Sequence, residues 1–546
     1  MMRPSVMILL AVSAVPTAGG LAAALWFGLD TASFERVLDA PGFGLSLVSA
    51  VWSGAIATAV SLLMAHLAVA AAVTGNWRTR LNALALPFLA MPHLAIGIGL
   101  ALVLAPSGLL LRLVSPYITG FTLPPDWFSV QDPHGLSLIA GLVIKETAFL
   151  VLVLFAALAQ VPADRLMRQA RSLGYGQLKG WCVAVAPLLQ RQIRLPLIAV
   201  LVFGVTNVEM AIPLGPGLPP TFSVMLWQWF TDPDPAINVQ AYTGSLLLLV
   251  VTALTVFGAA LLARLFRIVW RRTAESGSRR IGERTARRSV SAILGALWIL
   301  GTLGVIAILL RSAAGAWRFP KVLPTGDTVS AWLAALPVTG TAATTTVLLA
   351  ASTALVSVAL VLPVAERLHH NASAQRNVGL LLFLPLLLPQ MTFLFGVQVV
   401  LAAMRMDGTF IAVLWSHLIF ALPYVWGMLA AARGAIDPRY RDIARTLGVS
   451  RPRVWIEVTA PLLLRSGILA MALAFSVSAA LYLPTLFAGA GRIATAATEA
   501  AAAAGSGTLH LAALHALPLT ILPLLAFALA YTAHALVFRR HREVPG

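Results

Sequence analysis

Three ionisable residues stand inside apolar stretches of this chain, where a charge needs a compensating partner. Lys145 and Glu146 are neighbours within residues 136–160, and Glu209 lies near the end of residues 193–213. Ionisable side chains at membrane depth are costly, so they mark either a structural ion pair or a functional site. We predict an ion pair between Lys145 and Glu209 on consecutive helices. The alternative is that Glu146 or Glu209 faces a substrate.

Two further polar residues directly follow prolines inside apolar stretches. His93 follows Pro92, and Gln390 follows Pro389. Proline removes a backbone donor, so the carbonyls that it frees must be satisfied by neighbouring groups or by a water-filled cavity. One interpretation is a packed kink with a hydrogen-bonded polar side chain. The other is that His93 and Gln390 line a pathway from opposite sides.

A short polar segment occurs twice in the apolar background. The first copy is RQARSLG at 168–174, and the second is DIARTLG at 442–448. In both copies the alanine precedes the glycine by four residues, and a Pro-Leu-Leu return begins thirteen residues after the glycine. The two copies are 274 positions apart. A surface element presented twice indicates a partner that is itself present twice.

The local geometry of this segment follows from its residue types. Ala170 and Ala444 allow close approach of another surface, and Gly174 and Gly448 favour a left-handed helix cap. The pattern predicts a short helix, a glycine turn and a second short helix along the membrane surface. The return to the bilayer begins at two prolines, Pro187 and Pro461. An ordinary amphipathic interfacial loop is the alternative, and the matched spacing of two copies disfavours it.

The composition of the chain is that of a membrane protein. The chain is 59% hydrophobic and 11% charged, with a mean hydropathy of +0.88, whereas soluble domains carry about 25% charged residues. A span needs roughly 20 apolar residues. The sequence predicts an all-α integral membrane protein with twelve spans, at 5–27, 44–73, 81–104, 136–160, 193–213, 241–266, 290–310, 341–364, 377–404, 410–432, 464–487 and 511–538.

The basic residues predict the orientation of these spans. With twelve spans, the arginines of both polar repeats and of the C-terminus fall on one side of the membrane. An excess of Lys and Arg marks the cytoplasmic side, so we expect both termini in the cytoplasm. The net charge of +18 is explained by such loops beside anionic lipid, without nucleic acid. The single cysteine, Cys182, excludes disulfides and a cysteine metal site.

The chain divides into two halves in the sequence. Residues 271–289 are rich in Arg and contain Ser and Gly, which is typical of a solvated cytoplasmic linker. We predict a first transmembrane domain at 1–270 and a second at 290–546. An even number of spans in each half makes the repeats parallel, related by an axis along the membrane normal.

At the repeated segments the sequence resembles the "EAA" loops of permeases in ATP-binding-cassette (ABC) importers. The Ala-x-x-x-Gly core and the Pro-Leu-Leu return match, whereas Arg168 and Asp442 occupy the position of the family's glutamate. Gln169 and Ile443 occupy the position of its first alanine. Over nearly its whole length the chain resembles the fused permeases of the thiamine and ferric-iron importer group, closest to a poorly characterised branch of it.

The resemblance implies the partners of the chain and the residues that bind them. Two copies of a cytoplasmic ABC ATPase would dock on the two loops, and a periplasmic or extracellular binding protein would deliver the substrate. ATP and Mg²⁺ would bind to the ATPase, and this chain would bind no cofactor or metal and would be no enzyme. It contains no G-x-x-x-x-G-K-[ST] phosphate loop. The implied docking residues are Arg168, Ala170, Gly174, Pro187, Asp442, Ala444, Gly448 and Pro461. The implied location is the bacterial inner membrane.

A twelve-span secondary carrier driven by an ion gradient is the alternative class. Such carriers commonly carry a charged Gly-x-x-x-Asp-Arg-x-Gly loop after the second span, but this chain has GNWRTR at 75–80. A carrier also has no need of matched docking loops. The substrate stays open between thiamine, ferric iron and another small solute, because selectivity in such importers often resides in the binding protein.

Overall fold

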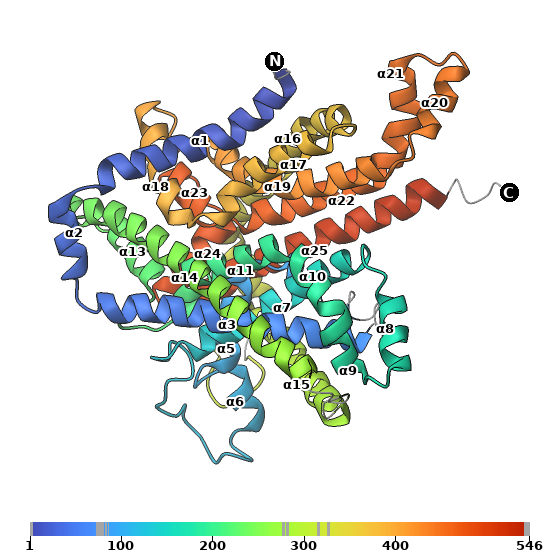
Figure 1. Cartoon of the computed structure of the whole chain (residues 1–546). Coiled ribbons are helices and arrows are strands. Elements are labelled where there is room, and N and C mark those ends of the chain that lie inside the picture. The colour runs from blue at the N-terminus through green and yellow to red at the C-terminus, as the bar shows by residue number, and fades with distance from the viewer. Residues whose placement is uncertain are drawn as a thin grey trace. The chain divides into compact units, whose positions relative to one another are not determined.

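The computed structural model contains helices and no strands in the part of the chain that it describes (Figure 1). The described residues are 4–72, 81, 85, 87–275, 279, 283–313, 317–324 and 328–539. Within them, ten helices are long and apolar enough to span a bilayer, and two bent helix pairs raise the number to twelve if each pair is one span. The predicted all-α integral membrane fold is confirmed.

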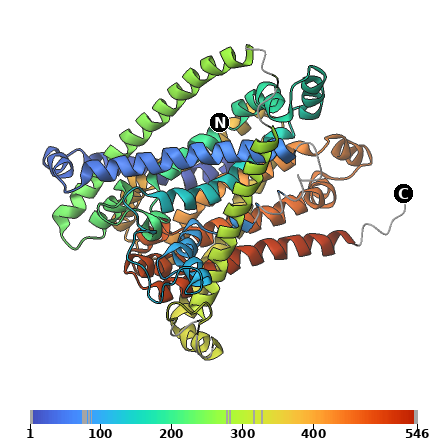
Figure 2. The same cartoon turned by 90° about the horizontal axis from the view of Figure 1, so that it is seen from below.

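The helices follow one another in a similar order in the two halves. Those of the first half are α1 (Pro4–Gly28), α2 (Thr31–Leu38), α3 (Phe43–Ala72), α5 (His93–Leu104), α6 (Leu109–Val114), α7 (Leu136–Leu158), α8 (Ala163–Ser172), α9 (Gln177–Gly180), the π-helical turn η1 (Trp181–Val185), α10 (Ala186–Gln192), α11 (Arg194–Thr206), α12 (Ala211–Leu214), α13 (Phe222–Phe230) and α14 (Pro235–Glu275). Figure 2 shows α14 as one long helix.

Those of the second half are α15 (Glu283–Ser312), α16 (Thr328–Leu368), α17 (Ala372–Phe383), the 3₁₀ turn η2 (Leu384–Leu387), α18 (Gln390–Ala403), α19 (Phe410–Ala435), α20 (Arg439–Thr446), α21 (Arg451–Val454), the π-helical turn η3 (Trp455–Thr459), α22 (Ala460–Ala480), α23 (Leu483–Gly489), α24 (Ala496–Gly505) and α25 (Leu509–Arg539).

The structural repeat extends far beyond the two polar segments. From α7 onward, matching elements of the two halves begin or end 274 positions apart. This holds for the starts of α7 and α19, of η1 and η3, and of α14 and α25. It also holds for the ends of α11 and α22. The two halves therefore use the same succession of elements although few residues are identical between them.

One loop interrupts this register. His93 begins α5 and Gln390 begins α18, and these residues are 297 positions apart. The segment between the third and fourth spans is therefore 23 residues longer in the first half, and it contains α6. This longer segment lies at the end of α7 opposite the α8–α9 loop.

Arg112 of α6 holds the longer segment in place. Its guanidinium donates to the carbonyls of Trp317, Arg318 and Lys321 at 3.0, 3.0 and 2.8 Å. Its Nε donates to the carbonyl of Ser107 at 2.7 Å, and its Cζ lies 4.4 Å from the ring centre of Trp317. Such a multiply bonded arginine fixes geometry because its donors form a rigid planar fork.

The internal contacts divide the chain into two compact units. Unit 1 contains Met1–Ala24, Leu336–Glu499 and Pro518–Gly546, and unit 2 contains Leu25–Ala335 and Ala500–Leu517. The beginning of α1 thus belongs to the unit that is otherwise built from the second half. The predicted domain boundaries at 270 and 290 describe the sequence repeat, which is a different division of the chain.

In unit 2, α3 packs against α7 and α11, and α15 packs against α5. Glycines permit the closest approaches. A Cβ on Gly54 of α3 would lie 2.5 Å from the backbone nitrogen of Val205, and one on Gly99 of α5 would lie 2.9 Å from the carbonyl oxygen of Gly304. Small residues at such crossings let helix backbones approach closely, as is common in membrane bundles.

In unit 1, α1 is part of the core. Val6 and Leu9 are buried in one cluster with residues of α16, α17, α19 and α22. Trp415 donates its indole N–H to the carbonyl of Val12 at 2.9 Å. Further along α1, a Cβ on Gly396 of α18 would collide with the carbonyl of Gly20. The first helix therefore has a fixed position in this unit.

Several of the predicted spans are broken, and two of the breaks lie at the prolines for which a kink was predicted. The third span breaks at Met91 and Pro92, before α5. In the ninth span the segments Ala372–Leu387 and Gln390–Ala403 meet at 98°, because Pro389 cannot continue the hydrogen-bond ladder. The fifth span is bent by 72° near Ile193, and a second break separates α11 from α12. A break at 481–482 likewise separates α22 from α23.

The structure describes helix at both ends of the predicted linker, residues 271–289. Residues 271–275 continue α14, and residues 283–289 belong to α15. Of the residues between these helices, the structure describes Arg279. Long side chains such as Arg favour helix, so the basic composition alone did not require an irregular segment.

Candidate functional site

The first polar repeat forms a helical hairpin at the end of α7 (Figure 1). Helix α8 ends at Ser172, and Gly174 adopts a left-handed conformation with φ of 81°. Tyr175 N–H donates to the carbonyl of Ala170 at 3.0 Å, and Gly174 N–H donates to that of Arg171 at 2.9 Å. These two bonds are those of a Schellman cap, so the glycine has the role that the sequence predicts.

The second repeat has the same geometry. Gly448 has φ of 80°. Val449 N–H donates to the carbonyl of Ala444 at 3.1 Å, and Gly448 N–H donates to that of Arg445 at 2.9 Å. Both hairpins then return through a π-helical turn, η1 or η3, and the next helix begins close to Pro187 or Pro461. The π-helix is rare in proteins, and where single π-helical turns occur they often lie at functional sites.

The two hairpins present different side chains at matching positions. Arg168 and Asp442 are both exposed, so the first hairpin offers a cation where the second offers an anion. Leu173 and Leu447 precede the two glycines and are 62% and 77% exposed. The two hairpins therefore share an exposed leucine at the same position beside the glycine turn.

The repeat alanines differ in their surroundings. Ala170 is buried, and its Cβ would lie 3.1 Å from a Cβ placed on Gly180 of α9, so it closes the hairpin itself. Ala444 is partly exposed. At Ala170 the surface that approaches closely is therefore α9 of the same hairpin. Ala444 stays partly exposed in the second hairpin.

Apolar and neutral contacts attach the first hairpin to unit 2. Met167 and Trp181 are buried. The indole N–H of Trp181 donates to Nδ1 of His66 on α3 at 3.4 Å, and the side chain of Gln177 donates to the carbonyl of Ala70 at 2.6 Å. Arg279 also contacts this hairpin, because its carbonyl accepts from Gly176 N–H at 2.9 Å.

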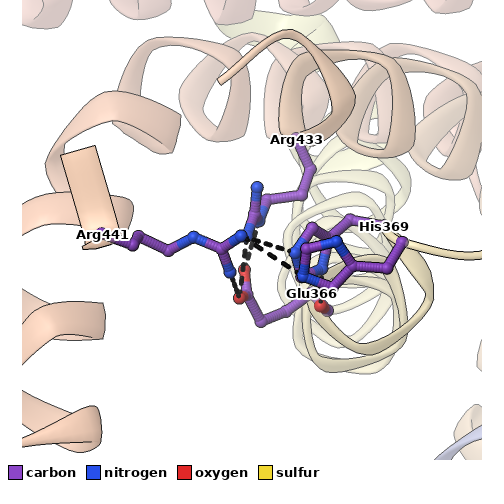
Figure 3. A network of polar contacts seen from close by, with 5 residues as sticks. Glu366, His369, Arg433 and Arg441 are labelled. Atoms are coloured by element: carbon purple, nitrogen blue, oxygen red, sulfur yellow. Dashed lines mark hydrogen bonds and ion pairs between the residues drawn. The ribbon is translucent and has the colours of Figure 1, made fainter. Parts of the chain in front are cut away.

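The second hairpin is attached to unit 1 by a charged network (Figure 3). Glu366 at the end of α16 accepts from the buried Arg433 of α19 at 2.5 and 3.0 Å. Arg441 of α20 donates to Glu366 at 3.4 Å and to His369 at 2.8 Å. One carboxylate thus connects the hairpin helix to two long helices.

The protonation state of His369 follows from its contacts. Its Nδ1–H donates to the carbonyl of Glu366, so Nε2 is free to accept from Arg441. Burial lowers the pKa of His369 below its ordinary value, and the charges of Arg433 and Arg441 act in the same direction. Neutral imidazole, which can accept a hydrogen bond, is the form that this network needs.

Within the bundle of unit 2, Lys145 and Glu146 bind the two sides of the broken third span. The Lys145 ammonium donates to the carbonyls of Phe88 and Leu89, both at 2.8 Å, and to that of Met91. Glu146 contacts Nε2 of His93 at 3.0 Å. The pairing of Glu146 with His93 was not predicted from the sequence.

Glu209 lies in the break between α11 and α12. Asn207 shapes this break, because its side-chain oxygen accepts from the backbone N–H groups of Met210 and Ala211 at 2.9 and 3.1 Å. Lys145 interacts electrostatically with both Glu146 and Glu209. All three ammonium donors have carbonyl acceptors, so a direct Lys145–Glu209 ion pair stays a prediction, as does a substrate contact of either acid.

In unit 1, a different cluster occupies the membrane-embedded region. His417 of α19 contacts Ser478 at 2.7 Å and Thr485 at 2.8 Å, on the two sides of the break between α22 and α23. Ser478 also bonds to Thr353 at 3.1 Å. Gln390 begins α18 after the bend at Pro389. Whether Gln390 lines a pathway stays a prediction.

Comparison with known proteins identifies the family of this multi-span helical protein. The chain is 31% identical over 507 residues, 92% of its length, to the inner membrane ABC transporter permease protein YnjC of Escherichia coli (strain K12), of which 90% is covered. No family model matches the chain. The protein belongs to the ABC transporter permeases.

Proposed function

We propose that the chain forms the translocation pathway of an ABC importer and is coupled to a separate ATPase through its two hairpins. The permease family is established by the similarity to YnjC. The coupling role is supported by one observation above all. Two hairpins with the same Schellman cap, the same π-helical return and exposed leucines recur 274 positions apart.

Two copies of one cytoplasmic ATPase are the partner that fits a duplicated hairpin. An ATPase groove that accepts the shared backbone geometry could bind either hairpin. Arg168 and Asp442 would then meet the same groove with opposite charge, so the two copies would be held with unequal strength. The docking surface comprises the residues around Arg168, Ala170, Gly174 and Pro187, and around Asp442, Ala444, Gly448 and Pro461.

The proposal includes location and delivery. We expect the inner membrane of a bacterium, with both termini in the cytoplasm on the side of the hairpins, as the basic residues indicate. A periplasmic or extracellular binding protein would deliver the solute at the other side. Thiamine, ferric iron and other small solutes remain the candidate substrates, and ATP with Mg²⁺ would be bound by the ATPase.

Native mass spectrometry of the tagged chain, co-expressed with its neighbouring genes, tests this proposal. The expected species is one permease with two copies of one ATPase. The variants Gly174→Val and Gly448→Val force a β-branched residue into a left-handed conformation and should each remove ATPase copies. Gly120→Val is the matched control, since Gly120 also has positive φ (73°) but lies in the longer outer segment.

The outcomes separate the two classes of transporter. Loss of ATPase from the hairpin variants and retention in Gly120→Val support the importer. A permease that purifies alone, with hairpin variants indistinguishable from the wild type, would overturn the coupling role and favour a secondary carrier.

A further inference from the structure

The break of the third span leaves backbone carbonyls without their helical donors. In a continuous helix, Phe88 would accept from the N–H of residue 92, but residue 92 is proline and has none. The chain then turns at Met91 and Pro92 before α5 begins at His93. The last four carbonyls before such a break need other donors, and a lipid-embedded segment has little water to supply them.

Lys145 supplies donors at this position. Its ammonium has three N–H groups, and they bond to three of the four carbonyls in question, those of Phe88, Leu89 and Met91. A positive charge at the C-terminal end of a helical segment is also favoured by the helix dipole. Lys145 is 5% exposed, so its ammonium group bonds to protein carbonyls and not to solvent.

Glu146 binds the opposite side of the same break. It contacts His93, the first residue of α5, at 3.0 Å. A negative charge near the N-terminus of a helix is favoured for the reciprocal reason. One turn of α7 therefore contacts both segments of the third span, each with the charge that suits that segment's end.

The second half has no charge at the corresponding turn. The positions 274 residues after Lys145 and Glu146 are Ile419 and Phe420 of α19, both buried. Phe420 stacks on Phe393 of α18 at a centroid distance of 5.9 Å. This stack joins α19 to α18 about one turn after the break at Pro389.

We propose that Lys145 and Glu146 are positioning residues that replace the helix bonds lost at Pro92 and fix the broken third span to the fourth. By this assignment the third and fourth spans of the first half move as one body during transport. Lys145 acts through carbonyls, and no contact with the transported solute is required of it.

A double-mutant cycle in thermal stability tests the role of Lys145. The proteins are the wild type, Lys145→Met, Pro92→Ala and the combination, purified in mild detergent, with Ile419→Met as a volume-conserving control at the matching position. Alanine restores an N–H at residue 92 and permits a continuous helix. We expect Lys145→Met to lower the thermal midpoint much less in the Pro92→Ala background than in the wild type.

If Lys145→Met does not assemble, recovery of a folded protein by the added Pro92→Ala supports the same conclusion. Equal losses in both backgrounds, or no recovery, overturn it. This cycle requires neither the ATPase nor a substrate, so its failure is distinct from failure of the importer proposal.

A second measurement separates positioning from mere folding. Pro92→Ala should stay folded and retain its ATPase copies, yet lose most vanadate-sensitive ATP hydrolysis in lipid nanodiscs, because the fixed break is gone. Unchanged hydrolysis in Pro92→Ala would show that the break has no role in transport.

Discussion

The carboxylate of Glu366 binds the guanidinium of Arg433 through both of its oxygens, at 2.5 and 3.0 Å. Arg433 is 1% exposed and Glu366 is 23% exposed, so this pair joins the ends of α16 and α19 at a partly buried site. Arg441 of α20 uses the same carboxylate. The position of the second hairpin therefore depends on one acidic side chain.

Replacing Glu366 with Gln should destabilise the protein and loosen α20. The amide keeps the shape but leaves the buried Arg433 charge without a counterion, which costs about 3 kcal/mol. Thermal unfolding in detergent should show this loss. Glu457→Gln is the control, because the Arg453–Glu457 pair is exposed and should contribute less than about 1 kcal/mol. Equal effects of the two variants would contradict the role assigned to Glu366.

Acidification should weaken the attachment of the second hairpin. The pKa of His369 is lowered by burial in the folded protein, so the unfolded chain takes up a proton more readily. The stabilising contribution of His369 is then present above its ordinary pKa of about 6.5 and is lost as pH falls below it. His369→Gln, whose amide oxygen can still accept from Arg441, should show a smaller loss of thermal midpoint between pH 7.5 and 5.5.

The exposed His134 provides the control for this pH dependence. His134→Gln should leave the loss of thermal midpoint between the two pH values unchanged, because His134 lies in the longer segment between the third and fourth spans, far along the chain from the hairpin. A His369→Gln protein with the full pH dependence of the wild type would assign the effect to another group.

Replacing Arg112 with Lys should release the longer segment between the third and fourth spans. Lysine keeps the charge but has three donors in place of the rigid fork that reaches four carbonyls, so we expect a local loss of about 2 kcal/mol. Chymotrypsin should cut after Tyr117, which is 97% exposed, several times faster than in the wild type. In the control variant Arg36→Lys, which changes an exposed arginine, chymotrypsin should cut after Tyr117 at the wild-type rate.

A methyl group on Gly396 should prevent the normal packing of α1. It would meet the carbonyl of Gly20, and overpacking of this kind costs about 1–3 kcal/mol. Gly340→Ala on α16 has open space around the new Cβ and should be neutral or slightly stabilising. Comparing the thermal midpoints of the two variants in detergent tests this contact, and a neutral Gly396→Ala would contradict it.

The sequence predicted the elements whose signals are local. The glycine caps at Gly174 and Gly448 follow from residue type and spacing, and the twelve apolar stretches correspond to the ten spans and two bent pairs. Pro92 and Pro389 pointed to two of the breaks. The break after Thr206 has no proline, and the cap that Asn207 provides is visible only when Met210 and Ala211 are placed.

The sequence did not predict which groups contact each other in the folded protein. The pair of Lys145 with Glu209 stays a prediction, and the backbone carbonyls that accept from Lys145 have no sequence signature. Glu366 and Arg433 each lie just beyond a predicted span and resemble ordinary interfacial charges. Their pairing depends on the packing of α16 against α19, which hydropathy does not specify.

The placement of α1 in unit 1 has a consequence for biosynthesis. Trp415, which bonds to Val12, follows it by 403 positions. At about 5–20 residues per second, the ribosome needs roughly 20–80 s to make that stretch. During this time the first helix is in the nascent chain without its final neighbours, so an insertion factor or surrounding lipid must cover the face that later packs on α18.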